Sequence, residues 1–212
     1  MRYAKLLTVT VTLLLVILWG IQADAAGQGK GKSSKIPAPV PQTGQTICYD
    51  ANNNSMECDG TTGQDGDYQA GVPWPDPRFS DRGDGTVRDN LTGLIWLKDA
   101  GCIGQQTWVN ALETCNALAS PACGLTDGSV AGDWRLPNLR ELQSLIDYGR
   151  FAPALPEGHP FTIEQFYFYW SSTTSQNVSY PNNSWGVRIQ DGYVRYDGPP
   201  YEFFAWCVRG DQ

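Results

Sequence analysis

The sequence has 212 residues, of which 41% are hydrophobic and 17% charged, with 22 acidic groups against 15 basic ones and a formal net charge of -7. Soluble domains are ordinarily about 25% charged, whereas this chain is rich in Gly (23), Trp (8) and Tyr (10). The composition excludes a disordered tail, a coiled coil and a nucleic-acid-binding protein that depends on a basic face. It is compatible with a recognition surface, because such surfaces combine low charge with many aromatic residues.

The first 25 residues have the pattern of a secretory signal peptide. Arg2 and Lys5 precede an apolar stretch over residues 6–21, and Ala23 and Ala25 are the small residues expected before a cleavage point after Ala25. The alternative is an uncleaved anchor, but the apolar stretch is shorter than the about 20 residues that a bilayer span needs. We therefore expect export without a transmembrane segment after cleavage, with a final location in the periplasm, at the cell surface or in the medium.

The rest of the chain divides into three parts. Residues 26–43 form a flexible Gly/Lys/Pro linker, residues 44–77 an N-terminal hairpin and loop extension, and residues 78–212 a single folded domain. From residue 36 onward the sequence has 10 basic and 21 acidic residues, a net charge of -11. The folded part is therefore strongly acidic.

The first half of the folded part is predicted to contain three antiparallel strands and one helix, after a hairpin in the extension. Residues 46–57 predict that hairpin, with three Asn at its turn, and residues 60–71 predict a Gly/Asp-rich loop. Residues 78–97 predict the strands, separated by turns at Gly85 and Gly93. The apolar spacing over residues 107–119 predicts an amphipathic helix with Thr107 as its N-cap.

A second helix and a second group of strands follow. The helix begins at Asn138 with Glu141 as the partner in a capping box, and runs to about Asp147. Strands are expected over residues 166–172, 184–190 and 193–196, the last two joined by a two-residue turn at Asp191-Gly192. Residues 203–208 are apolar on both faces, which predicts a central strand.

Six cysteines in an exported chain indicate three disulfides, although six cysteines allow 15 pairings. Zinc is the alternative, but the sequence has no C-x-x-C motif and a single histidine. The positions of the cysteines suggest the pairing. Cys48 and Cys58 face each other across the first hairpin, and Cys102 and Cys123 flank the first helix. Cys115, on the buried face of that helix, can reach Cys207 in the central strand. The predicted pairs are Cys48–Cys58, Cys102–Cys123 and Cys115–Cys207.

Five short motifs carry a resemblance to a known family. They are residues 83–87 (GDGTV), 92–96 (TGLIW), 132–138 (GDWRLPN) with the helix that follows, 169–172 (YWSS) and the closing 208–209. Over about residues 79–210 the chain resembles the Lcl C-terminal domain family, a domain whose function is not established and which is named for a collagen-like adhesin of Legionella. The motifs are also similar to C-type lectin-like folds, those of formylglycine-generating enzymes and of the variable proteins of diversity-generating retroelements.

The resemblance implies a compact, disulfide-stabilised α+β domain, C-type lectin-like, with two helices packed on a twisted antiparallel sheet. It also implies a ligand face at the loop-rich C-terminal hairpin region. The chain departs from that adhesin in two ways, and the second weighs against the adhesin's sulfated polysaccharides as ligands. The chain has a short linker in place of a collagen-like stalk, and its acidic domain disfavours anions unless Arg188, Arg195 and their neighbours form a local basic patch.

Several candidate sites have a structural interpretation that we favour. His159 lies in a turn-like setting, and Arg135 is expected to be a buried or half-buried structural arginine that bonds backbone carbonyls or a carboxylate. The Asp residues at 65, 67, 81, 84 and 89 could bind calcium, but Asp-Gly turns occur without metal far more often. The tripeptides Arg-Gly-Asp at 82–84 and 209–211 are most simply coincidences, and the four tryptophans Trp96, Trp134, Trp170 and Trp206 are expected in the core.

The polar and aromatic stretch over residues 175–201 is the predicted ligand-binding region. Tyr and Trp offer a large contact area with few rotatable bonds, while Asn and Ser adapt their hydrogen bonds to the ligand. The alternative is an ordinary solvated hairpin. The candidate residues are Asn177, Tyr180, Asn182, Asn183, Trp185, Arg188, Tyr193, Arg195, Tyr196, Asp197 and Tyr201.

We therefore expect an exported, non-catalytic recognition domain without metal or cofactor that binds an extracellular glycan or protein, with an oligomeric state that the sequence leaves open. One variant is a retroelement-diversified binding protein whose copies differ mainly over residues 175–201. The alternatives are an enzyme of the formylglycine-generating type, which needs a free thiol, and a structural envelope protein that assembles through the same face.

Overall fold

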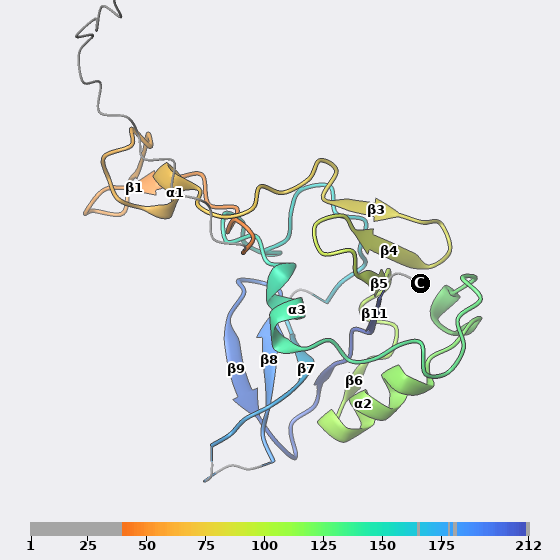
Figure 1. The fold of residues 1–212 in the computed structure, drawn as a ribbon. Helices are drawn as coiled ribbons and strands as arrows, with labels where there is room; N and C mark the ends of the chain where they lie inside the picture. Colours follow the sequence, from red (N-terminus) through yellow and green to blue (C-terminus); the bar gives the residue numbers. More distant parts are fainter. Residues whose placement is uncertain (1–39, 165, 178, 180–181, 211–212) are drawn as a thin grey trace, which may run out of the picture. The chain divides into compact units, whose positions relative to one another are not determined.

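A computed structural model describes residues 40–164, 166–177, 179 and 182–210 (Figure 1). The predicted signal peptide and most of the predicted linker lie outside the described residues. The described chain is α+β, as predicted, with two larger sheets, one two-stranded sheet and short helices. None of its described helices has the length and apolarity to cross a membrane.

One larger sheet has four antiparallel strands and comes mainly from the first half of the domain. Its two predicted turns are confirmed, since Gly85 and Gly93 have φ angles of 86° and 76°, which glycine adopts without strain. The turns fix the register that puts Val87 opposite Trp96 in the core. In the order β11-β5-β4-β3, the strands are β11 (Val208–Arg209), β5 (Ile95–Leu97), β4 (Thr86–Asp89) and β3 (Phe79–Asp81).

The other larger sheet carries the predicted binding region and has five strands. The sheet is mixed rather than wholly antiparallel as predicted, because β10 runs parallel to β7. In the order β6-β10-β7-β8-β9, the strands are β6 (Gln105–Gln106), β10 (Phe203–Phe204), β7 (Phe168–Thr174), β8 (Ser184–Arg188) and β9 (Val194–Asp197).

The predicted central strand over residues 203–208 is not one strand. Its first two residues form β10 in the five-stranded sheet, and its end belongs to β11 in the four-stranded sheet. Ala205, Trp206 and Cys207 lie between the two strands and are fully buried, and the Trp206 indole N–H donates to the Leu97 carbonyl at 2.7 Å. The segment is apolar on both faces because it crosses the core between the sheets.

The predicted two-residue turn at Asp191-Gly192 is also wrong, since β8 and β9 are joined by a longer loop. The Arg188 N–H donates to the Tyr193 carbonyl at 2.9 Å, which encloses four residues. Ile189 is drawn into the core, and its carbonyl accepts from the Ala154 N–H at 2.8 Å. Residues such as Ile189, which a two-residue turn would leave in the strands, therefore belong to the loop because they pack in the core.

Both predicted helices are present, and they begin where expected. In α3 (Leu139–Ser144), Asn138 accepts from the Glu141 N–H at 3.0 Å while the Glu141 carboxylate accepts from the Asn138 N–H at 2.7 Å, so the capping box is confirmed. α3 ends before Asp147, whose N–H donates instead to the Ala154 carbonyl. In α2 (Trp108–Ala117), Thr107 holds the N-cap position, but its side chain makes no capping hydrogen bond.

The domain core is dominated by aromatic side chains, and the four tryptophans predicted to be buried are fully so. The Trp206 ring lies 5.2 Å from Trp96 and 4.9 Å from Phe161 between centroids. All six cysteines lie in the described part, and the three predicted disulfides are confirmed: Cys48–Cys58, Cys102–Cys123 and Cys115–Cys207. The last of these ties α2 to the segment that crosses between the sheets.

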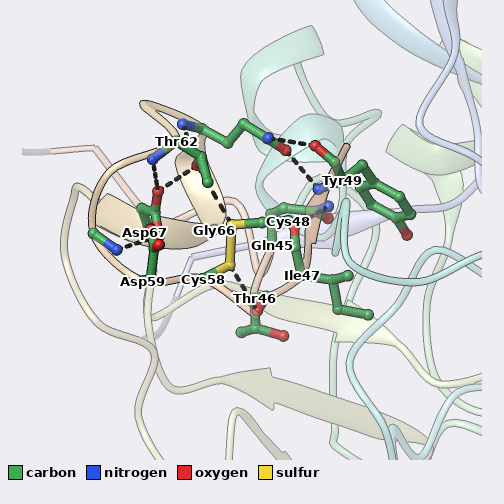
Figure 2. Close-up of a disulfide and its surroundings, with 12 residues drawn as sticks. Gln45, Thr46, Ile47, Cys48, Tyr49, Cys58, Asp59, Thr62, Gly66 and Asp67 are labelled. Atoms are coloured by element: carbon green, nitrogen blue, oxygen red, sulfur yellow. Dashed lines mark hydrogen bonds between the residues drawn. A yellow bond between two sulfur atoms is a disulfide. The ribbon is translucent and has the colours of Figure 1, made fainter. Parts of the chain in front are cut away.

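The extension contains the predicted hairpin, formed by β1 (Cys48–Tyr49) and β2 (Ser55–Met56). The expected loop over residues 60–71 includes a short helix, α1 (Asp65–Tyr68), which packs on the Cys48–Cys58 disulfide (Figure 2). Gly66 of α1 permits this packing, because a Cβ there would lie 2.9 Å from the Cys58 Sγ and 2.8 Å from the Ile47 carbonyl oxygen. The Asp67 carboxylate accepts from the Gly60 and Thr62 N–H groups and so holds the neighbouring loop.

Candidate ligand-binding surface

The β8–β9 hairpin divides the predicted ligand residues between two faces of the sheet. Directly paired residues of antiparallel strands share a face, and successive residues alternate between faces. Arg195 pairs with Gly186 on one face, whereas Tyr196 pairs with Trp185 on the other. The predicted residues therefore form two clusters instead of the single site that the sequence suggested.

Two arginines and three aromatic rings make up the first cluster, here called the arginine–aromatic face: Phe168, Arg188, Tyr193, Arg195 and Tyr201. Phe168 lies between the two guanidinium groups, whose Cζ atoms are 5.5 Å (Arg188) and 4.9 Å (Arg195) from its ring centroid. The Arg188 Cζ also lies 5.4 Å from the centroid of the Tyr193 ring, and the Arg195 Cζ lies 5.6 Å from that of the Tyr201 ring. These distances are those of cation–π contacts, so the rings hold both arginines in place.

Gly186 creates the space that this arrangement needs. A Cβ at residue 186 would lie 3.1 Å from the Phe203 ring, which occupies the room left by the missing side chain. Phe203 stacks on Phe168 with 5.0 Å between centroids and lies 5.6 Å from the Arg195 Cζ. The glycine thus allows aromatic packing beneath Arg195.

Each arginine of the face is paired with its own aspartate. The Arg188 Nε donates to the Asp191 carboxylate at 2.9 Å, and Arg195 donates to Asp197. The hydrogen bond from Arg188 holds the pKa of Asp191 below its usual value and raises that of Arg188. Two positive and two negative charges cancel, so the local basic patch that sulfated polysaccharides would require is not formed here.

Tyr193 and Tyr201 present the most accessible rings of the arginine–aromatic face, at 55% and 53% exposure. The sequence prediction did not include Phe168 among the ligand residues, because it stood within an apolar strand. Its alternation with the buried Tyr169 was the available signal, since alternate residues of a strand lie on opposite faces. Phe166 and Tyr167, predicted to open that strand, precede β7 and are exposed.

The opposite face of the hairpin holds Trp185, Tyr196 and Asn177. The Trp185 and Tyr196 rings meet edge to face with 5.0 Å between centroids, and the Asn177 Nδ2 lies 3.5 Å from the Tyr196 hydroxyl. Both rings are half-buried, so they present less surface to a ligand than Tyr193 and Tyr201.

Asn182 and Asn183, also among the predicted ligand residues, lie just before β8. Asn183 holds the connection between β7 and β8, because its carbonyl accepts from the Ser175 N–H at 2.7 Å, while Asn182 is exposed. Tyr180 lies outside the described residues.

The other sequence candidates lie outside the two clusters of the hairpin. His159 is half-buried, its ring lies 6.1 Å from that of Phe161, and burial lowers its pKa. Arg135 pairs with both carboxylate oxygens of Glu141 at 2.6 and 2.7 Å, as predicted, but it is exposed and not buried or half-buried as expected. The tripeptide at 82–84 spans the β3–β4 turn, where the Arg82 Nε lies 3.7 Å from the Asp84 carboxylate.

The aspartates considered for calcium have hydrogen-bond donors or basic partners within the chain. Asp84 accepts from Thr86, Asp81 from Lys98, and Asp89 pairs with Arg78 at 3.0 Å. In the described part, one group of side chains has the spacing of metal ligands, namely Cys48, Cys58 and Asp67. Both of its sulfur atoms belong to a disulfide, which leaves no thiolate ligand there.

A comparison with protein families identifies the family of the domain. Residues 85–209 match the family model described as the Lcl C-terminal domain. No match was found among curated proteins. The matched range includes α2, α3 and the whole arginine–aromatic face, and it excludes the extension.

Proposed function

The chain belongs to the Lcl C-terminal domain family, and from that premise we propose that it is an exported recognition domain that binds an extracellular glycan through the arginine–aromatic face. The observation that carries the proposal is the pair of exposed rings, Tyr193 and Tyr201, beside two arginines whose positions are fixed by Phe168. A site held rigid before the ligand arrives loses less conformational entropy on binding.

The chemistry of the face suits a neutral sugar. Sugar rings stack on tyrosine, and hydroxyl groups bond both to guanidinium N–H donors and to carboxylate acceptors. Arg188 directs its Nε and one terminal nitrogen to Asp191, which leaves its remaining N–H groups for a ligand. Since the two arginine–aspartate pairs cancel in charge and the chain from residue 36 has a net charge of -11, we favour neutral over sulfated glycans.

The cysteines support a non-catalytic role over the formylglycine-generating alternative. That chemistry depends on a reactive thiol, and all six cysteines of this chain are paired in disulfides. Export is supported by the N-terminal pattern and by these disulfides, which persist in oxidising compartments.

A glycan array probed with the full-length exported chain tests the proposal. We expect binding to neutral glycans that falls at least tenfold in the double variant Tyr193→Ala/Tyr201→Ala. The matched control is Tyr49→Ala/Tyr68→Ala, which removes two exposed tyrosines from the extension and should leave binding unchanged. Unchanged binding in the first variant, or binding restricted to sulfated glycans, would contradict the proposal.

A protein ligand is the second candidate, and the exposed Phe166 and Tyr167 directly before β7 favour it. Aromatic residues of this kind are enriched at protein interfaces. If the partner is a second copy of the chain, as in the envelope-protein alternative, light scattering will show a mass that grows with concentration. A folded chain that binds no glycan on the array would favour the protein ligand.

A further inference from the structure

A pocket of about 620 Å³ lies where the extension meets the loop that follows α3. Its lining includes Gln42 of the predicted linker, Gly44, Gln45 and Trp74 of the extension, and Asp147 and Arg150 of the domain. Its volume falls within the range of about 300 to 1,000 Å³ that is usual for small-molecule sites. Because the family match begins at residue 85, the extension supplies walls that lie outside the matched domain.

Close backbone approach between the two parts shapes the pocket. The Tyr148 N–H donates to the Thr43 carbonyl at 2.8 Å, and the Trp74 indole N–H donates to the Gln42 carbonyl at 3.0 Å, which fixes the ring in the wall. Gly44 has a φ of 84°, and a Cβ there would lie 2.7 Å from the Asp147 Cγ. Glycine is therefore needed at residue 44 both for its conformation and for its size.

Asp147 is the unusual group in this wall. The residue is 6% exposed and its side chain 9%. Its Oδ1 accepts from the Gly149 N–H at 2.9 Å, but in the described part of the chain no donor lies within hydrogen-bond distance of its Oδ2. The nearest cation there is the Arg150 Nε, at 3.6 Å. Burial raises the pKa of Asp147 despite the Gly149 N–H and Arg150, so the carboxylate is poorly compensated.

The Asp147 side chain is mostly buried and its Oδ2 accepts no hydrogen bond in the described part of the chain, so a ligand that supplies a donor improves the compensation of this carboxylate. The donor could be an ammonium group or a hydroxyl. A second cation is disfavoured, because the Arg78 guanidinium already lies 5.4 Å from the Trp74 ring centroid and Arg150 already faces Asp147. A hydroxyl brings the donor without the charge.

We propose that this pocket binds one neutral saccharide unit, which donates a hydroxyl hydrogen bond to the Asp147 Oδ2 and lies against Trp74. The amides of Gln42 and Gln45 line the same space and supply both donors and acceptors for further hydroxyls. This site goes beyond the arginine–aromatic face and does not depend on it.

The test uses the full-length chain and a panel of methyl glycosides of neutral hexoses and N-acetylhexosamines. Binding is followed by the NMR signal of the Trp74 indole N–H, assigned by its absence in Trp74→Phe. We expect at least one glycoside to shift this signal in a saturable manner. If no glycoside shifts it, or if choline shifts it and the sugars do not, the assignment of a neutral saccharide is overturned.

Asp147→Asn is the informative variant, since it keeps the acceptor for Gly149 and removes the charge. The dissociation constant of the glycoside should rise about tenfold, because a charge-assisted hydrogen bond is lost. Glu113→Gln removes an exposed carboxylate from α2 and should leave the constant unchanged. Thermal unfolding of both variants checks that they fold, and equal affinity in folded Asp147→Asn and wild type overturns the proposal.

The proposals for the pocket and for the arginine–aromatic face can be tested separately. The variant Tyr193→Ala/Tyr201→Ala should bind the glycoside at Trp74 with unchanged affinity. If it loses this binding together with array binding, the saccharide site lies on the hairpin and the pocket proposal is overturned. If array binding does not depend on these tyrosines while Asp147→Asn weakens the glycoside, the proposal for the face fails and the pocket proposal stands.

Discussion

The extension and the domain that follows it are stabilised by different means. The domain buries four tryptophans in one core, and a disulfide joins α2 to the segment between its sheets. Among residues 40–77, by contrast, the buried residues are Cys48, Gly66 and Gly71, so a hydrophobic core is lacking there. A disulfide and hydrogen bonds to aspartates take its place. Covalent closure thus substitutes for apolar burial where a segment is too small to form a core.

The largest effect is expected from the disulfide of the domain. Cys115 and Cys207 are 92 residues apart, and closing a loop of this length stabilises the folded state by about 4 to 5 kcal/mol in the chain-entropy model. The variant Cys115→Ala/Cys207→Ala should lower the free energy of unfolding by about that amount. Urea denaturation followed by tryptophan fluorescence measures it, and an unchanged midpoint would refute the expectation.

An intermediate and local effect is expected from the disulfide of the extension. Cys48 and Cys58 are 10 residues apart, so the same model gives about 3 kcal/mol, felt only by the extension. In Cys48→Ala/Cys58→Ala, residues 40–77 should exchange amide hydrogens faster while the urea midpoint of the domain stays the same. Hydrogen exchange with mass spectrometry reads both regions in one sample. Loss of protection in both regions together would show that they unfold as one unit.

The smallest effect is on the pH dependence of stability. Here Glu141, in the domain, and Asp147, where the domain meets the extension, are expected to act in opposite directions. Burial works to raise the pKa of Glu141, but hydrogen bonds from Arg135 and from the Asn138 N–H outweigh it, so the pKa lies below its usual value of 4.5. Glu141 therefore contributes stability that is present above about pH 4.5 and is lost as the pH falls. The raised pKa of Asp147 has the opposite effect on stability. The contribution of Asp147 is present below pH 3.8 and is lost as the pH rises.

The free energies of unfolding at about pH 3 and about pH 7 measure this difference. Glu141→Gln should reduce the loss of stability on acidification, by about 1 kcal/mol after allowance for solvent screening of the half-exposed Arg135. Asp147→Asn should enlarge the loss of stability on acidification. The assignment of the two groups would be wrong if both variants changed it in the same direction.

Local signals predicted the parts of the fold that are determined locally. The capping box at Asn138, the glycine turns at Gly85 and Gly93 and the helical face that carries Cys115 each depend on residues close in sequence, and all are confirmed. The disulfide partner Cys207 was found because burial on both faces marked its segment, although the segment proved to cross between sheets instead of forming one strand.

The parts that could not be predicted depend on contacts between distant residues. Phe168 and Arg195 are 27 positions apart, and only the register of β7, β8 and β9 brings their side chains together. The sequence predicts Asp147 at the end of a helix, and nothing near it in sequence shows that Gly44 and Trp74 fold over it. Composition identified the aromatic region but could not divide it between two faces, because that division follows from pairing.

The segment over residues 203–209 also bears on the order in which the protein folds. It comes after every other strand of the described residues, yet β10 inserts between β6 and β7, and β11 completes the other sheet. Until a ribosome has made this segment, β6 has no neighbour in its sheet and Cys115 has no partner. The core of the domain therefore cannot close before residues 203–209 have been synthesised.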